Sequence, residues 1–145
     1  MSRLVLELRP GEMMIINGAP IRFCSRARIE LMAHARFLFG KQIMPPETAD
    51  TPARQLYLAL QAAYVGTDEE RVRGLQDGRA LAAACKTAIP SALARDILDR
   101  ALAAAEVDRC YTALKLARQI IRHEDLVLGR LPASSQERAP RPWVA

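Results

Sequence analysis

Two consecutive prolines, Pro45 and Pro46, separate two halves of the chain that differ in hydrophobic periodicity. Consecutive prolines cannot join a central strand and disfavour helix in the residue before them, so they indicate a module boundary. Short aliphatic runs alternate with turn residues before this point, whereas apolar residues recur every three or four positions after it. The sequence therefore predicts an α+β fold, with a strand-rich module over residues 1–44 and an antiparallel helical bundle over residues 45–128.

The first module predicts about five short antiparallel strands arranged as a meander. Asn17-Gly18 between two hydrophobic runs is the strongest hairpin signal, because a type I′ turn needs positive φ at both central positions. So small a sheet buries too little apolar area to offset the entropy of ordering, so we expect helices or a dimer to cover it. The predicted strands are residues 4–8, 13–16, 19–24, 28–32 and 36–39.

The sequence after the prolines predicts four amphipathic helices that form a small bundle. Thr51-Pro52 supplies an N-cap and a proline at the first helical position of the first helix. The second helix opens at Asp68 in an acidic run that complements the helix dipole. Gly74 and Gly78 are expected to weaken its first half.

The last two helices have apolar faces over residues 93–102 and 111–128. Asp108 is predicted to cap the fourth helix. Residues 129–145 contain three prolines and no periodicity, so we expect a disordered tail there.

The positive charge is concentrated in the first module. Seven basic and three acidic side chains occur up to Lys41, whereas the remainder carries 14 basic and 13 acidic ones. Such asymmetry indicates a polyanionic partner. A nucleic acid is favoured over a membrane, because guanidinium groups form bidentate contacts with phosphates and base edges. A merely solvated charged face is the competing interpretation. The candidate RNA-contacting residues are Arg9, Arg22, Arg26, Arg28, Arg36 and Lys41.

Nothing in the sequence indicates catalysis, a metal or a cofactor. The two histidines, His34 and His123, are interpreted as structural or surface residues, and no nucleotide-binding or hydrolase motif occurs. Cys24, Cys85 and Cys110 lack ligand or disulfide spacing and are interpreted as small buried hydrophobes. No signal peptide or membrane span is predicted, so we expect a cytoplasmic protein that does not engage a membrane.

Two patterns have both structural and functional interpretations. Phe23, Phe37 and Phe39 belong to short alternating strands of the first module, where phenylalanine packs in a core more often than it stacks on bases. The segment 111–121 is strongly amphipathic, with cations on its polar side at Lys115 and Arg118 and, directly after it, Arg122. Bundle packing is its ordinary role, and docking of a partner helix is the alternative.

Several blocks of the sequence, in order, resemble the FlbT family of flagellum biosynthesis regulators. They are Leu4-Val-Leu-Glu-Leu-Arg-Pro-Gly-Glu12 with Ile15-Ile-Asn-Gly18, Gly40-Lys-Gln-Ile-Met44, Thr51-Pro-Ala-Arg-Gln-Leu-Tyr57 and Tyr111-Thr-Ala-Leu-Lys-Leu-Ala-Arg118. The resemblance implies a post-transcriptional regulator that associates with the 5′ untranslated region of flagellin mRNA, represses its expression and promotes its decay. It also implies a counterpart, the small flagellar protein FlaF. Some members of the family act as activators.

The first module is also similar to the carbon storage regulator CsrA, an RNA-binding protein built as an interleaved β dimer. Arg9-x-Gly11-Glu12 followed by Met14-Ile-Ile16 carries this likeness, which implies a homodimer. The basic residue that CsrA uses on its last strand falls near Gly40, with Lys41 adjacent.

Two functional hypotheses follow. In the first, the basic strands bind the leader of flagellin mRNA while the helices dock a protein partner. In the second, the chain is a protein-interaction module for a FlaF-type protein or for flagellin itself, and it affects mRNA indirectly.

Overall fold

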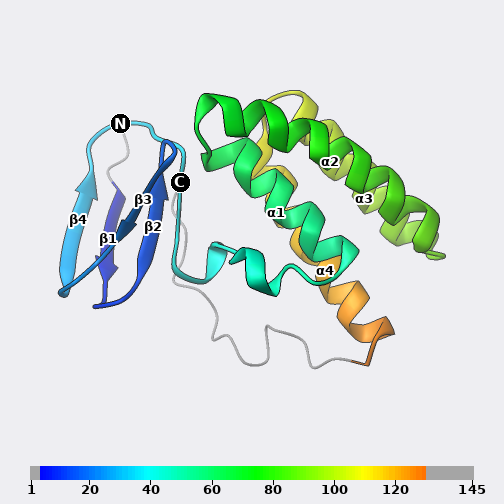
Figure 1. Ribbon diagram of the computed structural model, residues 1–145, viewed down its shortest axis with the longest axis horizontal. Helices are drawn as coiled ribbons and strands as arrows, with labels where there is room; N and C mark the ends of the chain where they lie inside the picture. Colours follow the sequence, from blue (N-terminus) through cyan, green and yellow to red (C-terminus); the bar gives the residue numbers. More distant parts are fainter. Residues whose placement is uncertain (1–3, 130–145) are drawn as a thin grey trace.

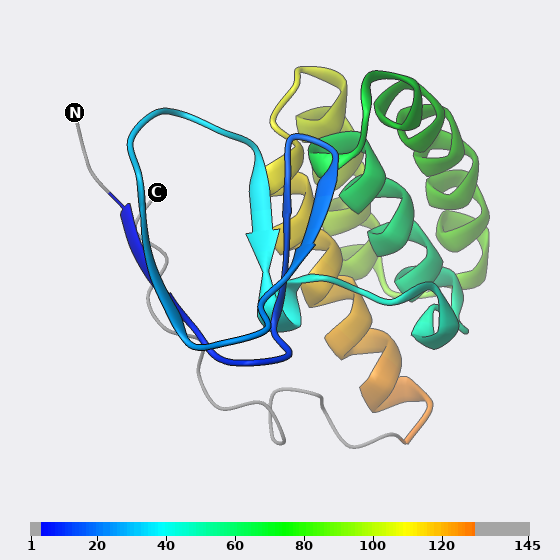
Figure 2. The same ribbon diagram turned by 60° about the vertical axis from the view of Figure 1, so that its left-hand side comes forward.

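The computed structural model describes residues 4–129, in which five strands precede four helices and form three layers (Figures 1 and 2). A two-stranded antiparallel sheet faces a three-stranded sheet of order β3-β2-β5, and the helices lie beyond the second sheet. This arrangement confirms the predicted α+β class. The strands are β1 (Leu4–Leu8), β2 (Met13–Ile16), β3 (Ala19–Arg22), β4 (Ala27–Leu31) and β5 (Phe37–Phe39).

The predicted meander is wrong in its pairing, although the predicted strands form within a residue or two. β2 and β3 make the expected hairpin, with φ of 48° at Asn17 and 86° at Gly18. β1, however, pairs with β4 in a register that runs from Leu4 opposite Leu31 to Leu8 opposite Ala27. The reason is that two facing sheets enclose a small core which one meander would leave uncovered. That core consists of Leu6, Leu8, Met14, Phe37 and Phe39, which confirms the interpretation of Phe37 and Phe39 as core residues, and the partly buried Phe23 packs against it.

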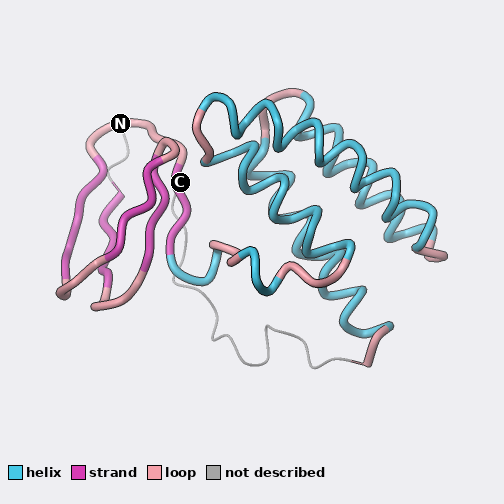
Figure 3. Tube along the Cα trace, viewed as in Figure 1, coloured by secondary structure: helices cyan, strands magenta, loops and turns pink. Residues whose placement is uncertain are grey.

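The predicted bundle of four antiparallel helices is confirmed, and strands and helices occupy separate parts of the chain (Figure 3). The Thr51 hydroxyl accepts a hydrogen bond from the Arg54 N–H and caps the first helix, and Pro52 occupies the first position. Thr67 and Glu70 form a capping box at the start of the second. Two short 3₁₀ turns, η1 (Gly40–Gln42) and η2 (Pro46–Thr48), precede α1 (Pro52–Val65), α2 (Asp68–Ala88), α3 (Ala92–Glu106) and α4 (Cys110–Val127).

Asp108 does not cap α4, contrary to the prediction. The N-cap residue is Arg109, and Asp108 has a left-handed φ of 61° in the turn between α3 and α4. A capping side chain needs an extended backbone at its own residue, which this tight turn does not allow. The Asp108 carboxylate instead lies 3.5 Å from Nη2 of Arg71.

Gly74 allows α2 to pack closely on α1, whereas Gly78 leaves room for a methyl group. Both residues are buried. A Cβ atom on Gly74 would lie 2.6 Å from the Ala59 carbonyl oxygen and 2.7 Å from the Ala63 nitrogen. Gly74, which reduces the helix propensity of α2, is therefore the residue that permits the close contact between the two helices.

Hydrogen bonds attach the segment after β5 to the helices. The Tyr57 hydroxyl donates to the Gln42 carbonyl at 2.6 Å, and the Gln61 side chain exchanges two hydrogen bonds with the Met44 backbone at 2.7 and 3.2 Å. Leu38 of β5 belongs to the main helical core. Helices thus cover the outer face of the three-stranded sheet, as expected. The predicted disordered tail lies outside the described residues apart from Gly129.

Candidate nucleic-acid interface

Four of the six predicted contact residues lie at one end of the strand module, which we call the arginine end (Arg9, Arg22, Arg26 and Arg28). Arg9 follows β1 and Arg26 precedes β4, and the pairing of Leu8 with Ala27 makes these two positions neighbours. The Gly11 N–H donates to the Phe23 carbonyl at 2.6 Å. This bond joins the β1–β2 and β3–β4 connections, which lie side by side at the lower edge of the module (Figures 1 and 2).

All four side chains of the arginine end are exposed to solvent. Among residues 4–129, none of these guanidinium groups forms an ion pair. Acidic residues are nevertheless close, because Arg28 stands opposite Glu7 and the Arg9 N–H donates to Oε1 of Glu12 at 2.7 Å. The arginine end thus presents guanidinium groups that can contact phosphates, with a positive field reduced by two carboxylates.

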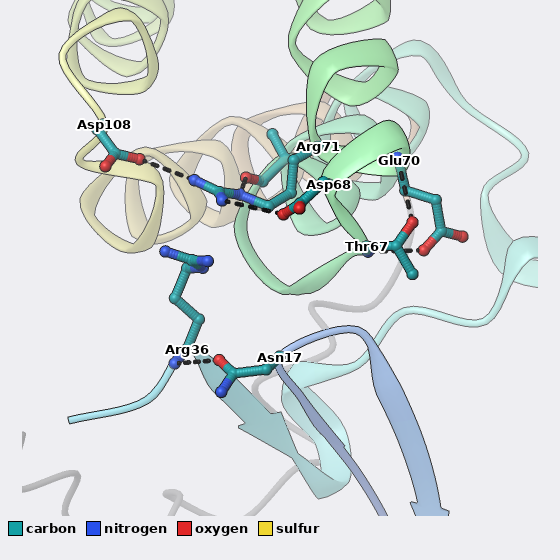
Figure 4. Close-up of polar contacts among 8 residues, drawn as sticks. Asn17, Arg36, Thr67, Asp68, Glu70, Arg71 and Asp108 are labelled. Carbon is teal, nitrogen blue, oxygen red and sulfur yellow. Dashed lines mark hydrogen bonds and ion pairs between the residues drawn. The ribbon is translucent and has the colours of Figure 1, made fainter. Parts of the chain in front are cut away.

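The remaining two predicted residues lie elsewhere. Lys41 is exposed in η1 beside α4, and its carbonyl lies 3.5 Å from Nη2 of Arg118. Arg36 lies between the strands and the helices, where its N–H donates to Oδ1 of Asn17 at 3.1 Å. Its side chain extends toward Arg71 and Asp108 (Figure 4), and its Nε is buried without a hydrogen-bond partner among the described residues. The structure therefore divides the predicted set among three places.

Arg71 and Asp108 line a cleft of about 400 Å³ that the sequence did not indicate. Arg71 spans the cleft from Asp68, at 4.0 Å, to Asp108, at 3.5 Å, and donates to the Ala63 carbonyl through Nε at 3.4 Å. Burial, and after it the charge of Asp108, raises the pKa of the Cys110 thiol in the cleft wall, and the charges of Arg71 and Arg36 oppose this rise. Arg71 and Asp108 are 37 positions apart in sequence, and no local pattern predicts a contact between them.

A buried ion pair between α1 and α4 was also missed. The Arg54 guanidinium contacts the Asp125 carboxylate through Nη2–Oδ2 at 3.0 Å and Nη1–Oδ1 at 2.9 Å. The geometry of the first contact is that of a hydrogen bond, whereas the second is an ion-pair approach without hydrogen-bond alignment. Oε2 of Glu124 accepts from the Ala53 N–H at 3.2 Å. A signal was available, because Asp125 follows Ile121 by four residues and falls on the apolar face of the helix.

Other predicted features have mixed outcomes. Cys85 and Cys110 are buried free thiols, as predicted, but Cys24 is exposed because it lies in the connection that follows the edge strand β3. No group of three His, Cys, Asp or Glu residues that could hold a metal ion occurs among residues 4–129. No helix in that range is long and apolar enough to cross a bilayer.

The fold and the arginine end define a small α+β protein. It presents cations at one end of a strand module, and a four-helix bundle packs against that module. The chain matches the family described as "Flagellar protein FlbT" over residues 4–128, and it belongs to that family. The resemblance carried by the sequence blocks is thereby confirmed.

Relatives align over most of the chain. A protein of Mesorhizobium japonicum, named "Probable flagellum biosynthesis repressor protein FlbT", is 34% identical over 132 residues, which cover 88% of this chain and 86% of the relative. A Bradyrhizobium diazoefficiens protein named "Probable flagellum biosynthesis repressor protein FlbT 1" is 32% identical over 90% of this chain and 88% of its own. These names support a regulatory role in flagellar synthesis and describe no enzyme. No solved structure matches the chain, so the likeness of the strands to CsrA stays a prediction.

Proposed function

We propose that the chain is a cytoplasmic post-transcriptional repressor of flagellin synthesis that binds the 5′ untranslated region of flagellin mRNA and promotes its decay. Family membership and the repressor names of the relatives support the biological process. The single observation that carries RNA binding is the arginine end. There, two strand connections and the strand ends beside them place four exposed guanidinium groups on one edge of the module.

The chemistry of the arginine end suits a nucleic-acid backbone. Guanidinium groups form paired hydrogen bonds with phosphate oxygens, and single-stranded loops also offer base edges and stacking faces. Hydrogen bonds with Glu12 hold the Arg9 backbone, and Arg26 adjoins the paired Ala27, so binding would cost little backbone entropy at these two residues. Decay of the message would then be carried out by recruited nucleases.

A salt titration of leader binding tests the proposal. Arg26→Glu/Arg28→Glu should weaken binding of the full chain to flagellin leader RNA and lower the slope of log K against log salt by about 1.4, since each lost single-strand phosphate contact removes about 0.7. Arg73→Glu/Arg100→Glu is the matched control, because it makes the same charge change at exposed positions of α2 and α3. Equal affinity and slope for wild type and R26E/R28E would contradict the proposal.

The cleft beside Arg71 favours a second candidate function, docking of a FlaF-type protein or of flagellin. Two large apolar side chains stand exposed at this end of the helices, Val72 at 62% and Val107 at 65%. Apolar side chains beside a cleft are what a protein partner buries. Wild-type protein that co-elutes with a FlaF-type protein, but shows no shift of leader RNA at moderate salt, would favour this function over RNA binding. Val72→Asp should then abolish the co-elution.

We also propose a homodimer, because β3 is an edge strand with four exposed residues and an open backbone edge. Light scattering of the full chain across concentrations measures this directly, and a monomeric mass at all concentrations would contradict it.

A further inference from the structure

The polar face of α4 carries a row of cations, which we call the α4 stripe (Lys115, Arg118 and Arg122). These residues follow one another at intervals of three and four, so they lie on one side of the helix, about one turn apart. The opposite side is buried in the main core through Ala113, Ala117 and Ile120. The interpretation of this amphipathic segment as a bundle helix is thus confirmed, and its polar face is left to solvent.

The acidic residues of α4 do not neutralise this stripe. Glu124 and Asp125 turn toward α1, where they contact Arg54. Two cations of α2 have acidic partners on α3, because Arg79 contacts Glu106 at 2.6 Å and Lys86 contacts Asp99 at 2.9 Å. Within the described part of the chain, neither Lys115 nor Arg122 forms an ion pair. Positive charge therefore remains concentrated along α4.

Aromatic rings hold part of the stripe in position. The Arg118 guanidinium lies 5.2 Å from the centre of the Tyr57 ring, and its Nη2 donates to the Tyr57 hydroxyl at 3.1 Å. Lys115 Nζ lies 5.2 Å from the centre of the Tyr111 ring. Cations that are already ordered lose less conformational entropy when they bind a ligand.

Lys41 links the stripe to the strand module. The Lys41 carbonyl lies 3.5 Å from Nη2 of Arg118, so the exposed Lys41 side chain projects from the segment that adjoins α4. Lys41, which was predicted to contact RNA but lies away from the arginine end, is therefore next to a second group of cations.

We propose that the α4 stripe and Lys41 form a second nucleic-acid contact, which binds the phosphodiester backbone without reading bases. A backbone ligand is favoured over a protein because the fully exposed positions from Thr112 to Arg122 are all polar or cationic. Protein interfaces have an apolar or aromatic centre, whereas here Tyr57 is buried, Tyr111 is only partly exposed, and the first exposed apolar residue after Thr112 is Leu126. The inference rests on the proposed RNA-binding function and extends it from one edge of the strands to the helices.

Charge reversal on α4 tests this contact. Lys115→Glu/Arg122→Glu in the full chain should weaken binding of flagellin leader RNA about tenfold at moderate salt and lower the salt slope by about 1.4. An unrelated single-stranded RNA of equal length should lose the same factor, because backbone contacts carry no sequence information. The matched control is again Arg73→Glu/Arg100→Glu, which has the same net charge and should stay within about threefold of wild type.

The outcomes separate the inference from the proposed function. If R26E/R28E weakens binding but K115E/R122E behaves like R73E/R100E, the stripe is not a contact and the proposed function stands. If wild type binds neither RNA at moderate salt, both fail. Circular dichroism establishes that each variant is folded, and Lys115→Gln/Arg122→Gln, which removes charge without reversing it, should give a smaller loss in the same direction.

Discussion

Replacing Asp125 by alanine is expected to lower the free energy of unfolding by about 3 kcal/mol. Loss of one partner from a buried ion pair costs about 3 to 5 kcal/mol, because the other charge stays buried without compensation. The Asp125 side chain is fully buried and that of Arg54 is 15% exposed. The lower end of the range applies here because Glu124 remains 3.6 Å from Nη1 of Arg54.

Deprotonation cannot relieve this cost. In the native protein the hydrogen bond that Arg54 donates to Asp125 raises the pKa of Arg54, whereas burial acts to lower it. A guanidinium group that loses its carboxylate still stays charged at every pH at which the protein is folded. The destabilisation of Asp125→Ala should therefore persist across the neutral range.

Urea and thermal unfolding, followed by circular dichroism, measure the effect. For a chain of this size about 3 kcal/mol corresponds to a fall in Tm of about 6 to 12 °C. Glu106→Ala is the control, because it breaks an ion pair whose side chains are 49% and 39% exposed and should barely change the midpoint. Arg54→Met/Asp125→Leu should recover most of the loss, since both charges are gone. A double variant as unstable as Asp125→Ala would refute the explanation by an uncompensated buried charge.

Two further predictions concern packing and thiol reactivity. Gly74→Ala should lower the free energy of unfolding by about 1 to 3 kcal/mol through overlap with α1, whereas Gly78→Ala should raise it by up to about 1 kcal/mol, since its methyl group meets nothing closer than Leu60 at 3.5 Å. Urea unfolding of both variants tests this, and equal effects would contradict it. Burial raises the pKa of Cys85 to about 11, so its thiolate is scarce at about pH 8, and iodoacetamide should label the exposed Cys24 first. Peptide mapping by mass spectrometry measures the order, and early labelling of Cys85 would contradict it.

Local chemistry was sufficient to predict the elements of the fold but not the pairing of its strands. Asn17-Gly18 specifies a turn and Thr51-Pro52 specifies a helix start, because in each case the backbone preferences of two adjacent residues are sufficient. The pairing of β1 with β4 instead depends on a core shared by two sheets. Asp108 failed as a predicted cap for a related reason, because the geometry of the turn between two packed helices overrides the preference of its side chain.

The arginine end was predictable in composition and partly in position. Arg9, Arg22 and Arg26 flank strand ends, and strand ends of one small module are close in space whatever the pairing order. Arg36 and Lys41 are equally near strands in sequence, but packing of β5 against the helices carries them to other places. Their separation depends on tertiary contacts such as the one between Tyr57 and Gln42, which no local pattern contains.

The charge count of the sequence understates the positive surface of the helical half. Residues after Lys41 carry 14 basic and 13 acidic side chains, which indicates near neutrality. A count weights every charge equally, whereas the potential that a ligand meets depends on charges that are exposed and unpaired. Asp125 is buried, and Asp99 and Glu106 contact Lys86 and Arg79. Four acids of α3 and α4, Asp99, Glu106, Glu124 and Asp125, thus contact cations within the bundle, while Lys115 and Arg122 of the α4 stripe are exposed. The positive surface of the strand module therefore extends onto a helix.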